Sequence, residues 1–346
     1  MAMLKTEALP ATKPKRRLAL KEKMTWRFLM VILFLLLAIT GIVVSTSFGA
    51  VQVTFQELIG TVFLNEVSQY SNIIWNIRLP RTLVGALIGI NLALSGALLQ
   101  GLMKNPLADP HIIGVTSGAG LAGIIIIILF PTMEHLITPV AFLGAILAAF
   151  LVYFLAWKNG GIQPSRIILA GVAISALLGA GISGLMIFYS DRVHGALMWM
   201  SGGLSARSWP HVEMVLPYTL AGLVIAFMGA KHMNAMLLGD DTAKSLGVRV
   251  ELTRLFMTAV AALLAASAVS VVGLLGFVGL IVPHTARMLV GSDYRFLLPA
   301  SALLGVAIVT LSDTLARMAF APVEIPVGIM MAVFGAPFFL YLLRRV

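Results

Sequence analysis

The chain has 346 residues, of which 60% are apolar and only 11% are charged. Soluble domains carry roughly 25% charged residues, so this composition excludes a soluble globular fold and favours a chain whose solvent is lipid. The net charge of +10 fits inner loops rich in Lys and Arg better than nucleic-acid binding, and the absence of cysteine excludes disulfides and thiolate chemistry.

About ten apolar segments, each close to the ~20 residues that a membrane span needs, follow one another along the chain. They are predicted at 27–48, 80–103, 112–130, 137–157, 166–190, 211–230, 252–273, 275–290, 296–320 and 326–343. None shows the alternation of barrel strands, and an isolated strand leaves its backbone unsatisfied in lipid. The sequence therefore predicts an all-α, polytopic membrane helix bundle with about ten transmembrane helices.

A polar, basic tail over residues 1–26 precedes a single transmembrane domain over 27–346. A cleaved signal peptide would also begin with basic residues, but the apolar run over 28–44 is long enough to be a retained first span. With the tail inside, an even number of spans, here about ten, brings Arg344 and Arg345 to the same side. Most other Lys and Arg residues then fall in inner loops. We expect a multi-pass protein of the cytoplasmic membrane with both termini cytoplasmic.

The familiar catalytic motifs are missing. Gly118-Ala-Gly120-Leu-Ala-Gly123 has dinucleotide-fingerprint spacing, but no strand precedes it and it opens an apolar helix, so helix packing explains it better. The Gly-x-x-x-x-Gly-Lys-Ser/Thr phosphate loop and the His-Glu-x-x-His metal motif are absent. We therefore predict no catalytic residue, no cofactor and no metal site. The chain is not expected to be an enzyme, and any ATP hydrolysis must occur on another chain.

Two arginines stand at the predicted outer mouth of the second span, in Trp75-Asn-Ile-Arg78-Leu-Pro-Arg81-Thr82. Positive charge on the outer side opposes the usual distribution of Lys and Arg, which indicates a purpose for it. Contact with lipid headgroups is the alternative.

More specific motifs follow along the chain. Asn105-Pro-Leu-Ala-Asp-Pro110 comes after the second span, and Gly276-Phe-Val-Gly279 lies in the eighth. The full set of motifs covers 81–101, 105–110, 113–118, 169–173, 199–203, 238–248, 276–287, 298–299, 313–317, 324–328 and 335–340. Through them the chain resembles the FecCD-type, BtuC-like family of ABC importer permeases. Only the tail and the first span lie outside this likeness.

The resemblance implies a permease subunit that pairs with a second permease, either another copy or a paralogue. It also implies two ABC ATPase subunits inside and an extracytoplasmic substrate-binding protein outside; membrane lipid completes the partners, and nucleic acid is not expected. The implied function is ATP-driven alternating access that moves an iron(III)-siderophore across the cytoplasmic membrane. Haem and cobalamin-like corrinoids stay open as substrates.

The resemblance also implies three sets of functional residues. The residues that would dock the binding protein are Arg78, Arg81 and Arg317. The cytoplasmic coupling segment, about 234–250, would insert into the ATPase through Leu238, Gly239, Asp240, Asp241, Ala243, Lys244, Leu246 and Gly247. The inner gate would comprise Asn105, Leu107, Gln163, Pro164 and Ser165, with the passage lined by the fifth span.

Local alternatives remain for some of these residues. Guanidinium forks suit carboxylates of a docked protein, but Asp313 and Arg317 are one helical turn apart and could form an internal ion pair. Pro164 stands where many relatives carry a small hydroxyl residue. Asn91, Ser95 and Gln100 could line the channel or form hydrogen bonds between helices.

An ion-coupled secondary transporter is the competing class of function. Such proteins place paired ionisable residues in mid-membrane, whereas the predicted spans here carry their charges near their ends. This contrast favours a transporter driven by a separate ATPase.

Overall fold

The computed structural model describes residues 24–49, 51, 53–64, 69–158 and 161–343. The described chain is almost entirely helical; a short antiparallel hairpin joins β1 (Trp157–Lys158) to β2 (Gly161–Ile162). Most of the predicted basic tail and the terminal arginines lie outside the described residues.

The described helices confirm the predicted polytopic bundle. Seven are long and apolar enough to cross a membrane, and three shorter apolar helices join them, in agreement with the expected number. The long ones are α2 (Met24–Ser47), the continuous stretch of α4 (Ser71–Ile73), η1 (Ile74–Arg78) and α5 (Leu79–Leu102), the stretch of η3 (Pro131–Leu136) and α7 (Ile137–Ala156), α8 (Pro164–Phe188), α10 (Trp209–Leu237), α12 (Val250–Val272) and α14 (Tyr294–Met318). The shorter ones are α6 (Val115–Leu129), α13 (Val278–Val290) and α15 (Val327–Leu343).

Several short elements were not expected from the sequence. They are α3 (Phe55–Phe63), η2 (Pro110–Ile113), η4 (Ser190–Arg192) and α9 (Val193–Met200). By contrast, α11 (Asp240–Ser245) lies in the predicted coupling segment, for which the resemblance implies a short helix. A capping box begins α3, where the Thr54 hydroxyl accepts from the Glu57 amide and the Glu57 carboxylate accepts from the Thr54 amide. Thr-x-x-Glu is a sequence signature of a helix start, so this helix was predictable.

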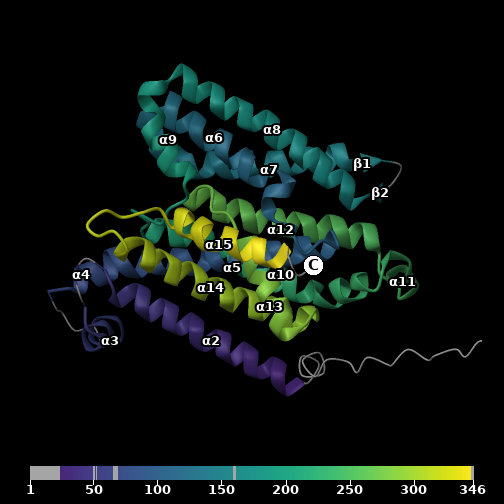
Figure 1. Cartoon of the computed structure of the whole chain (residues 1–346), viewed down its shortest axis with the longest axis horizontal. Helices are drawn as coiled ribbons and strands as arrows, with labels where there is room; N and C mark the ends of the chain where they lie inside the picture. The colour runs from purple at the N-terminus through teal and green to yellow at the C-terminus, as the bar shows by residue number, and fades with distance from the viewer. Residues whose placement is uncertain (1–23, 50, 52, 65–68, 159–160, 344–346) are drawn as a thin grey trace, which may run out of the picture.

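Helix α5 is the central element of the bundle, with α2 on one side and the α6–α8 group on the other (Figure 1). Its side chains are buried along nearly the whole length. Two glycines allow its neighbours to approach closely: a Cβ on Gly89 would overlap the backbone of Gly305 in α14, and a Cβ on Gly96 would overlap that of Gly279 in α13. Dispersion between closely packed backbones replaces the hydrophobic drive in lipid.

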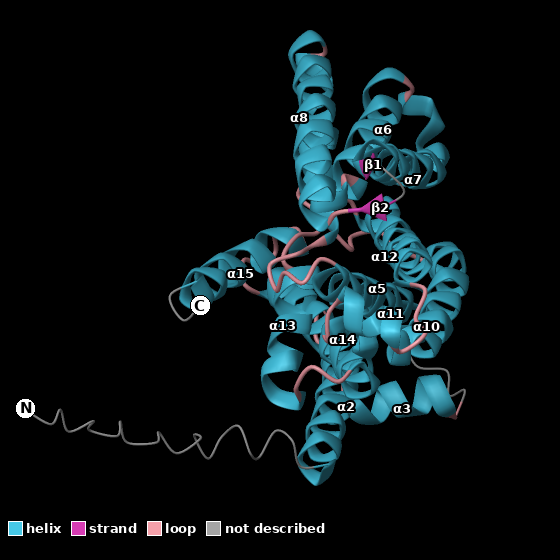
Figure 2. Cartoon of the chain, turned by 90° about the vertical axis from the view of Figure 1, so that its right-hand side faces the viewer, coloured by secondary structure: helices cyan, strands magenta, loops and turns pink. Residues whose placement is uncertain are grey.

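The two ends of the bundle carry different elements. In Figure 1, α11 and the β1–β2 hairpin lie at one end, whereas α3 and α4 lie at the other. Figure 2 looks from the α11 end and shows α8 at the top, α15 at the left and α10 at the right. The end with α11 is the one for which the sequence predicts a cytoplasmic position, and we call it the inner end.

Candidate functional site

The three predicted docking arginines come together at the outer end of the bundle. Arg81, on the first turn of α5, donates hydrogen bonds of 3.0 Å from both Nε and Nη2 to the carboxylate of Asp313 in α14. Its Nη1 donates to Glu324, at 2.9 Å. This bidentate geometry is the strongest form of an Arg–carboxylate pair.

Arg317 completes this cluster from the last turn of α14. Its Nε lies 3.2 Å from Asp313, an ion pair whose geometry does not make a hydrogen bond. Its terminal nitrogens donate to the carbonyls of Ser45, at 2.9 Å, and Phe48, at 3.1 Å. The internal ion pair that the sequence offered as an alternative is therefore present.

Arg78 is held by backbone alone. It lies on η1, a π-helical turn, and donates to the carbonyls of Thr46, Ser47 and Val51. The carbonyls at the end of α2 have no partner within the helix and take charged donors well.

These contacts leave the arginines little exposed. Arg78, Arg81 and Arg317 are 5%, 8% and 9% accessible, whereas the Glu324 side chain is 46% accessible. Burial alone would raise the pKa of Glu324, but the hydrogen bond and charge of Arg81 hold it below the usual value. The most exposed charged group of this cluster is thus the Glu324 carboxylate, which is paired with Arg81. Docking of a binding protein through the three arginines stays a prediction.

The predicted coupling segment forms a compact unit at the inner end. The structure shortens it, because α10 continues to Leu237, and it folds the middle into α11. Gly239 and Gly247 flank α11 with φ of 107° and 82°, a region that glycine occupies without steric cost. The predicted side chains divide between the two faces of α11: Ala243 is buried, whereas Leu238, Asp241, Lys244 and Leu246 are exposed.

Asp240 fastens α11 to the bundle. Its carboxylate accepts from Lys104, just after α5, and from Arg254 in α12, each at 2.8 Å. Burial would raise the pKa of Asp240, but these hydrogen bonds and charges outweigh it and keep the pKa below its usual value. Sequence reasoning placed Asp240 in the coupling segment but missed both partners, which are 136 and 14 residues away.

The predicted gate residues lie in the loop after α5 and at the start of α8. Asn105 turns the chain after α5, where its side chain accepts from the amide of Leu107, at 2.9 Å. Gln163 is the N-cap of α8, Pro164 is its first residue, and Ser165 is exposed. Pro is favoured at a helix start, which gives Pro164 a structural reason of its own.

Helix α8 packs closely against η2, the short helix that follows the Asn105 loop. A Cβ on Gly171, in α8, would overlap the carbonyl of Ile112, in η2. This glycine brings α8 against the segment that continues from the Asn105 loop.

The polar residues of α5 join helices and do not line an open space. Asn91 donates to Ser267 at 2.9 Å, and Ser95 donates to the carbonyl of Ala261 at 2.7 Å, both on α12. Gln100 donates to the carbonyl of Leu280 and accepts from Arg287 of α13. All three α5 side chains are buried, which settles this alternative in favour of interhelical hydrogen bonding.

No set of His, Cys, Asp or Glu that could hold a metal ion occurs among the described residues. The groups that are brought together are charged pairs at the two ends of the bundle and amide or hydroxyl bridges inside it.

The comparisons with known proteins agree with this geometry. The profile of the FecCD transport family matches residues 34–345. The chain is 46% identical to the cobalamin import system permease protein BtuC of Halobacterium salinarum, over 79% of this chain and 73% of that protein. It is 38% identical to the Fe(3+)-citrate import system permease protein YfmE of Bacillus subtilis, over 94% of this chain and 96% of that one.

A solved structure has the same fold. It is described as an inward-facing conformation of a putative metal-chelate type ABC transporter and is 30% identical, with a TM-score of 0.79 over 91% of this chain and 99% of that one. Together with the helical bundle and the sequence motifs, these matches show that the chain is an ABC importer permease and belongs to the FecCD transport family.

Proposed function

We propose that this permease imports a metal chelate, specifically an iron(III)-siderophore, across the cytoplasmic membrane by ATP-driven alternating access. The observation that carries the proposal is the attachment of α11 by Asp240 to Lys104 and Arg254. A partner that moves α11 would pull on α5 and α12 together, and α5 is the core of the bundle. Such a connection suits a pump driven by a separate ATPase pair at the inner end.

The exposed side chains of α11 support the same role. Leu238 and Leu246 are 63% and 62% accessible, and Asp241 and Lys244 are exposed nearby. Apolar groups ringed by charges form a typical protein interface. We assign this surface to the binding of an ABC ATPase subunit. Because two permeases pair, the transporter would contain two ATPase subunits, one on each permease.

A second permease subunit would cover α8. Leu169, Leu177 and Ile187 are 71%, 67% and 76% accessible along this helix. Gly179 and Gly184 face open space, where a Cβ would meet nothing within 4 Å. Small residues on an apolar helix face permit close approach of another helix, so we place the pathway between α8 and its counterpart in a homodimer or a paralogous pair.

The outer arginine cluster is our candidate for docking an extracytoplasmic binding protein. Acidic groups on that protein would compete with Glu324 for Arg81. Charges at the rim of an interface chiefly set docking rate and register.

The substrate class rests on relatives. A permease that aligns over nearly the whole chain is named for ferric citrate, and the related structure is described as of metal-chelate type. Cobalamin is the second candidate, because the relative with 46% identity is named for it. Both are metal ions wrapped in an organic ligand, which fits a pathway with apolar walls.

Reconstitution tests the mechanism and the substrate separately. The permease is placed in proteoliposomes with its ATPase and binding protein, and uptake of labelled ferric citrate, ferric hydroxamate, haem and cobalamin is measured. We expect uptake of one iron chelate against its gradient that requires ATP and survives proton and sodium ionophores. Uptake driven by an ion gradient without the ATPase would support a secondary transporter; ATP-driven uptake of cobalamin alone would change only the substrate.

A further inference from the structure

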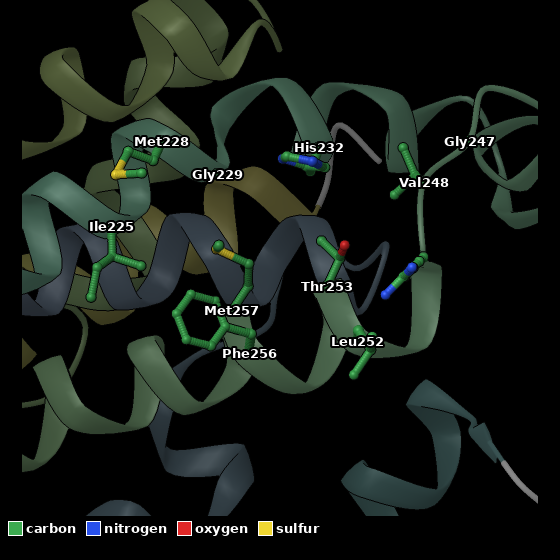
Figure 3. Close-up of a pocket in the computed structure, with 11 residues that line it drawn as sticks. Ile225, Met228, Gly229, His232, Gly247, Val248, Leu252, Thr253, Phe256 and Met257 are labelled. Carbon is green, nitrogen blue, oxygen red and sulfur yellow. The ribbon is translucent and has the colours of Figure 1, made fainter.

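A groove runs between α10 and α12 at the inner end of the bundle (Figure 3). Its volume is about 570 Å³, within the range of roughly 300–1,000 Å³ typical of ligand sites. The proposed transport function gives it no role. The residues that line it are Ile225, Met228, Gly229, His232, Gly247, Val248, Arg249, Leu252, Thr253, Phe256 and Met257.

The walls of the groove are apolar and face outward. Met228, Leu252 and Phe256 are 73%, 55% and 53% accessible. Gly229 lets the Met257 side chain pack against α10 and form the floor of the groove, because a Cβ there would overlap it. An outward apolar groove on two membrane-spanning helices is bathed by acyl chains.

One end of the groove is basic. Arg249 immediately precedes α12, and His232 lies opposite it near the end of α10. Both side chains are exposed, and neither has a hydrogen bond or ion pair with another described residue. By contrast, Arg254, one turn further along α12, is buried and paired with Asp240.

The basic end and the apolar walls of the groove correspond to the headgroup and the acyl chain of a phospholipid. From Arg249 to Phe256 the groove extends about 10 Å along α12, at about 1.5 Å per residue, which accommodates the upper part of an acyl chain. The basic end lies at the predicted cytoplasmic surface, where anionic headgroups are found, and basic pockets between helices on that side bind such headgroups.

Two other occupants fit less well. The second permease is assigned to α8, which lies on a different part of the circumference from α10 (Figure 2). The ATPase is assigned to α11, beyond the inner end, whereas the groove continues into the span as far as Ile225 and Met257.

We propose that the groove between α10 and α12 is a binding site for an anionic phospholipid, whose phosphate lies between Arg249 and His232 and whose acyl chain lies against Met228 and Phe256. The proposal requires only that α10 and α12 span a bilayer, so it stands or falls independently of the transported substrate. A bound lipid would bridge α10 to the loop between α11 and α12.

Fluorescence quenching tests this site directly in the full-length chain in vesicles. The substitution F256W places an indole at the open mouth of the groove, and the signal of the five natural tryptophans is subtracted with the unmodified chain. Dibrominated phosphatidylglycerol and dibrominated phosphatidylcholine are then compared as quenchers at equal mole fraction. L252W is the second reporter if F256W disturbs folding.

We expect phosphatidylglycerol to associate about five-fold more strongly than phosphatidylcholine, the advantage that one basic residue near the surface gives. The double variant R249Q/H232Q should reduce that preference to near unity. K158Q, which removes an exposed charge elsewhere at the inner end, should leave it intact.

Three results would overturn the site. Equal quenching by the two lipids removes the anionic preference, and a preference that survives R249Q/H232Q or disappears with K158Q removes the role of the groove's basic end. Absence of quenching by either lipid at both reporter positions shows that protein covers the groove.

Discussion

Arg81 and Asp313 form a two-pronged ion pair, 232 residues apart in sequence, that joins the outer end of α5 to the outer end of α14. Both side chains are buried, and the same Asp313 also faces Arg317. The pair therefore ties two spans together at the place where docking is proposed, and its loss has structural as well as functional effects.

Removal of one partner should be costly. We expect R81Q or D313N to lower the free energy of unfolding by less than the about 3–5 kcal/mol of a fully broken buried pair, because Asp313 keeps Arg317 and Arg81 keeps Glu324 as a second partner. The double variant R81Q/D313N should cost less than the sum of the two. Thermal and denaturant unfolding in detergent measures this; additive effects would show that the two side chains do not stabilise each other.

Glu324 offers a cleaner test of docking than any change to the arginines. If acidic groups of the binding protein pair with Arg81, then E324Q removes their competitor without breaking the Arg81–Asp313 pair. We expect the binding protein to bind about two- to five-fold more tightly, as for a partly exposed ion pair.

The control for this experiment is E134Q, which removes an exposed acid in η3, outside the cluster. Surface plasmon resonance with the purified binding protein gives both affinities. Unchanged or weaker binding of E324Q would remove Arg81 from the docking site, and an equal gain in E134Q would reduce the effect to net charge.

Asp240 should govern how firmly α11 is held. We expect D240N to speed amide hydrogen exchange across α11 and to allow ATP hydrolysis with less transport, because the attachments to Lys104 and Arg254 weaken together. D241N is the matched control for the exchange measurement, since Asp241 is the exposed neighbour on the same helix. Equal exchange rates in wild type and D240N would contradict the role of Asp240 as an attachment, and equal coupling would contradict its role in transport.

The sequence predicted the bundle because a membrane span is a local property. An apolar run of sufficient length can be recognised from the sequence alone, and the predicted 252–273 segment agrees closely with α12 (Val250–Val272). The predicted 275–290 span was less accurate: α13 starts at Val278, and the preceding Gly273 and Phe277 have positive φ. Apolar residues in a non-helical turn look the same in sequence as those in a helix.

The sequence could predict which residues belong to the candidate site, but not which of them form ion pairs with one another. Motifs singled out Arg81, Asp240 and Arg317 as residues in three separate segments. The ion pairs Arg81–Glu324 and Lys104–Asp240 depend on how elements far apart in the sequence pack against one another. One pairing was accessible from spacing alone, the Asp313–Arg317 pair one turn apart.

Gly96 should tolerate no side chain. G96A places a methyl group against the backbone of Gly279, and overpacking of this kind costs about 1–3 kcal/mol or more. We expect a lower unfolding temperature and a smaller yield of monodisperse protein. G203A makes the same chemical change where a Cβ would meet only Pro326, at 3.9 Å, and should behave like wild type in both assays. Equal behaviour of G96A would show that α5 and α13 separate easily.

We expect the free energy of unfolding to fall at acid pH because of Asp293. It caps α14 and accepts hydrogen bonds from the Arg295 side chain, at 2.7 Å, and from Asn234, also at 2.7 Å. The hydrogen bond from Arg295 is the main cause that lowers the pKa of Asp293 to about 2, from an ordinary value of 3.8. Because the folded pKa is the lower one, the stabilisation is complete above about pH 4 and is lost as the pH falls towards 2.

The expected loss across this window is at most about 2 kcal/mol, reduced by solvent screening at the partly exposed cap. Unfolding temperatures in detergent, measured from neutral pH down through the acid range, should therefore fall more steeply for wild type than for D293N. The control is D191N, whose carboxylate is 75% exposed beside Arg192 and which should retain the full wild-type slope. If D293N and wild type lose stability in parallel, the cap of α14 is not the titrating group, and the acid sensitivity must come from the carboxylates elsewhere in the bundle.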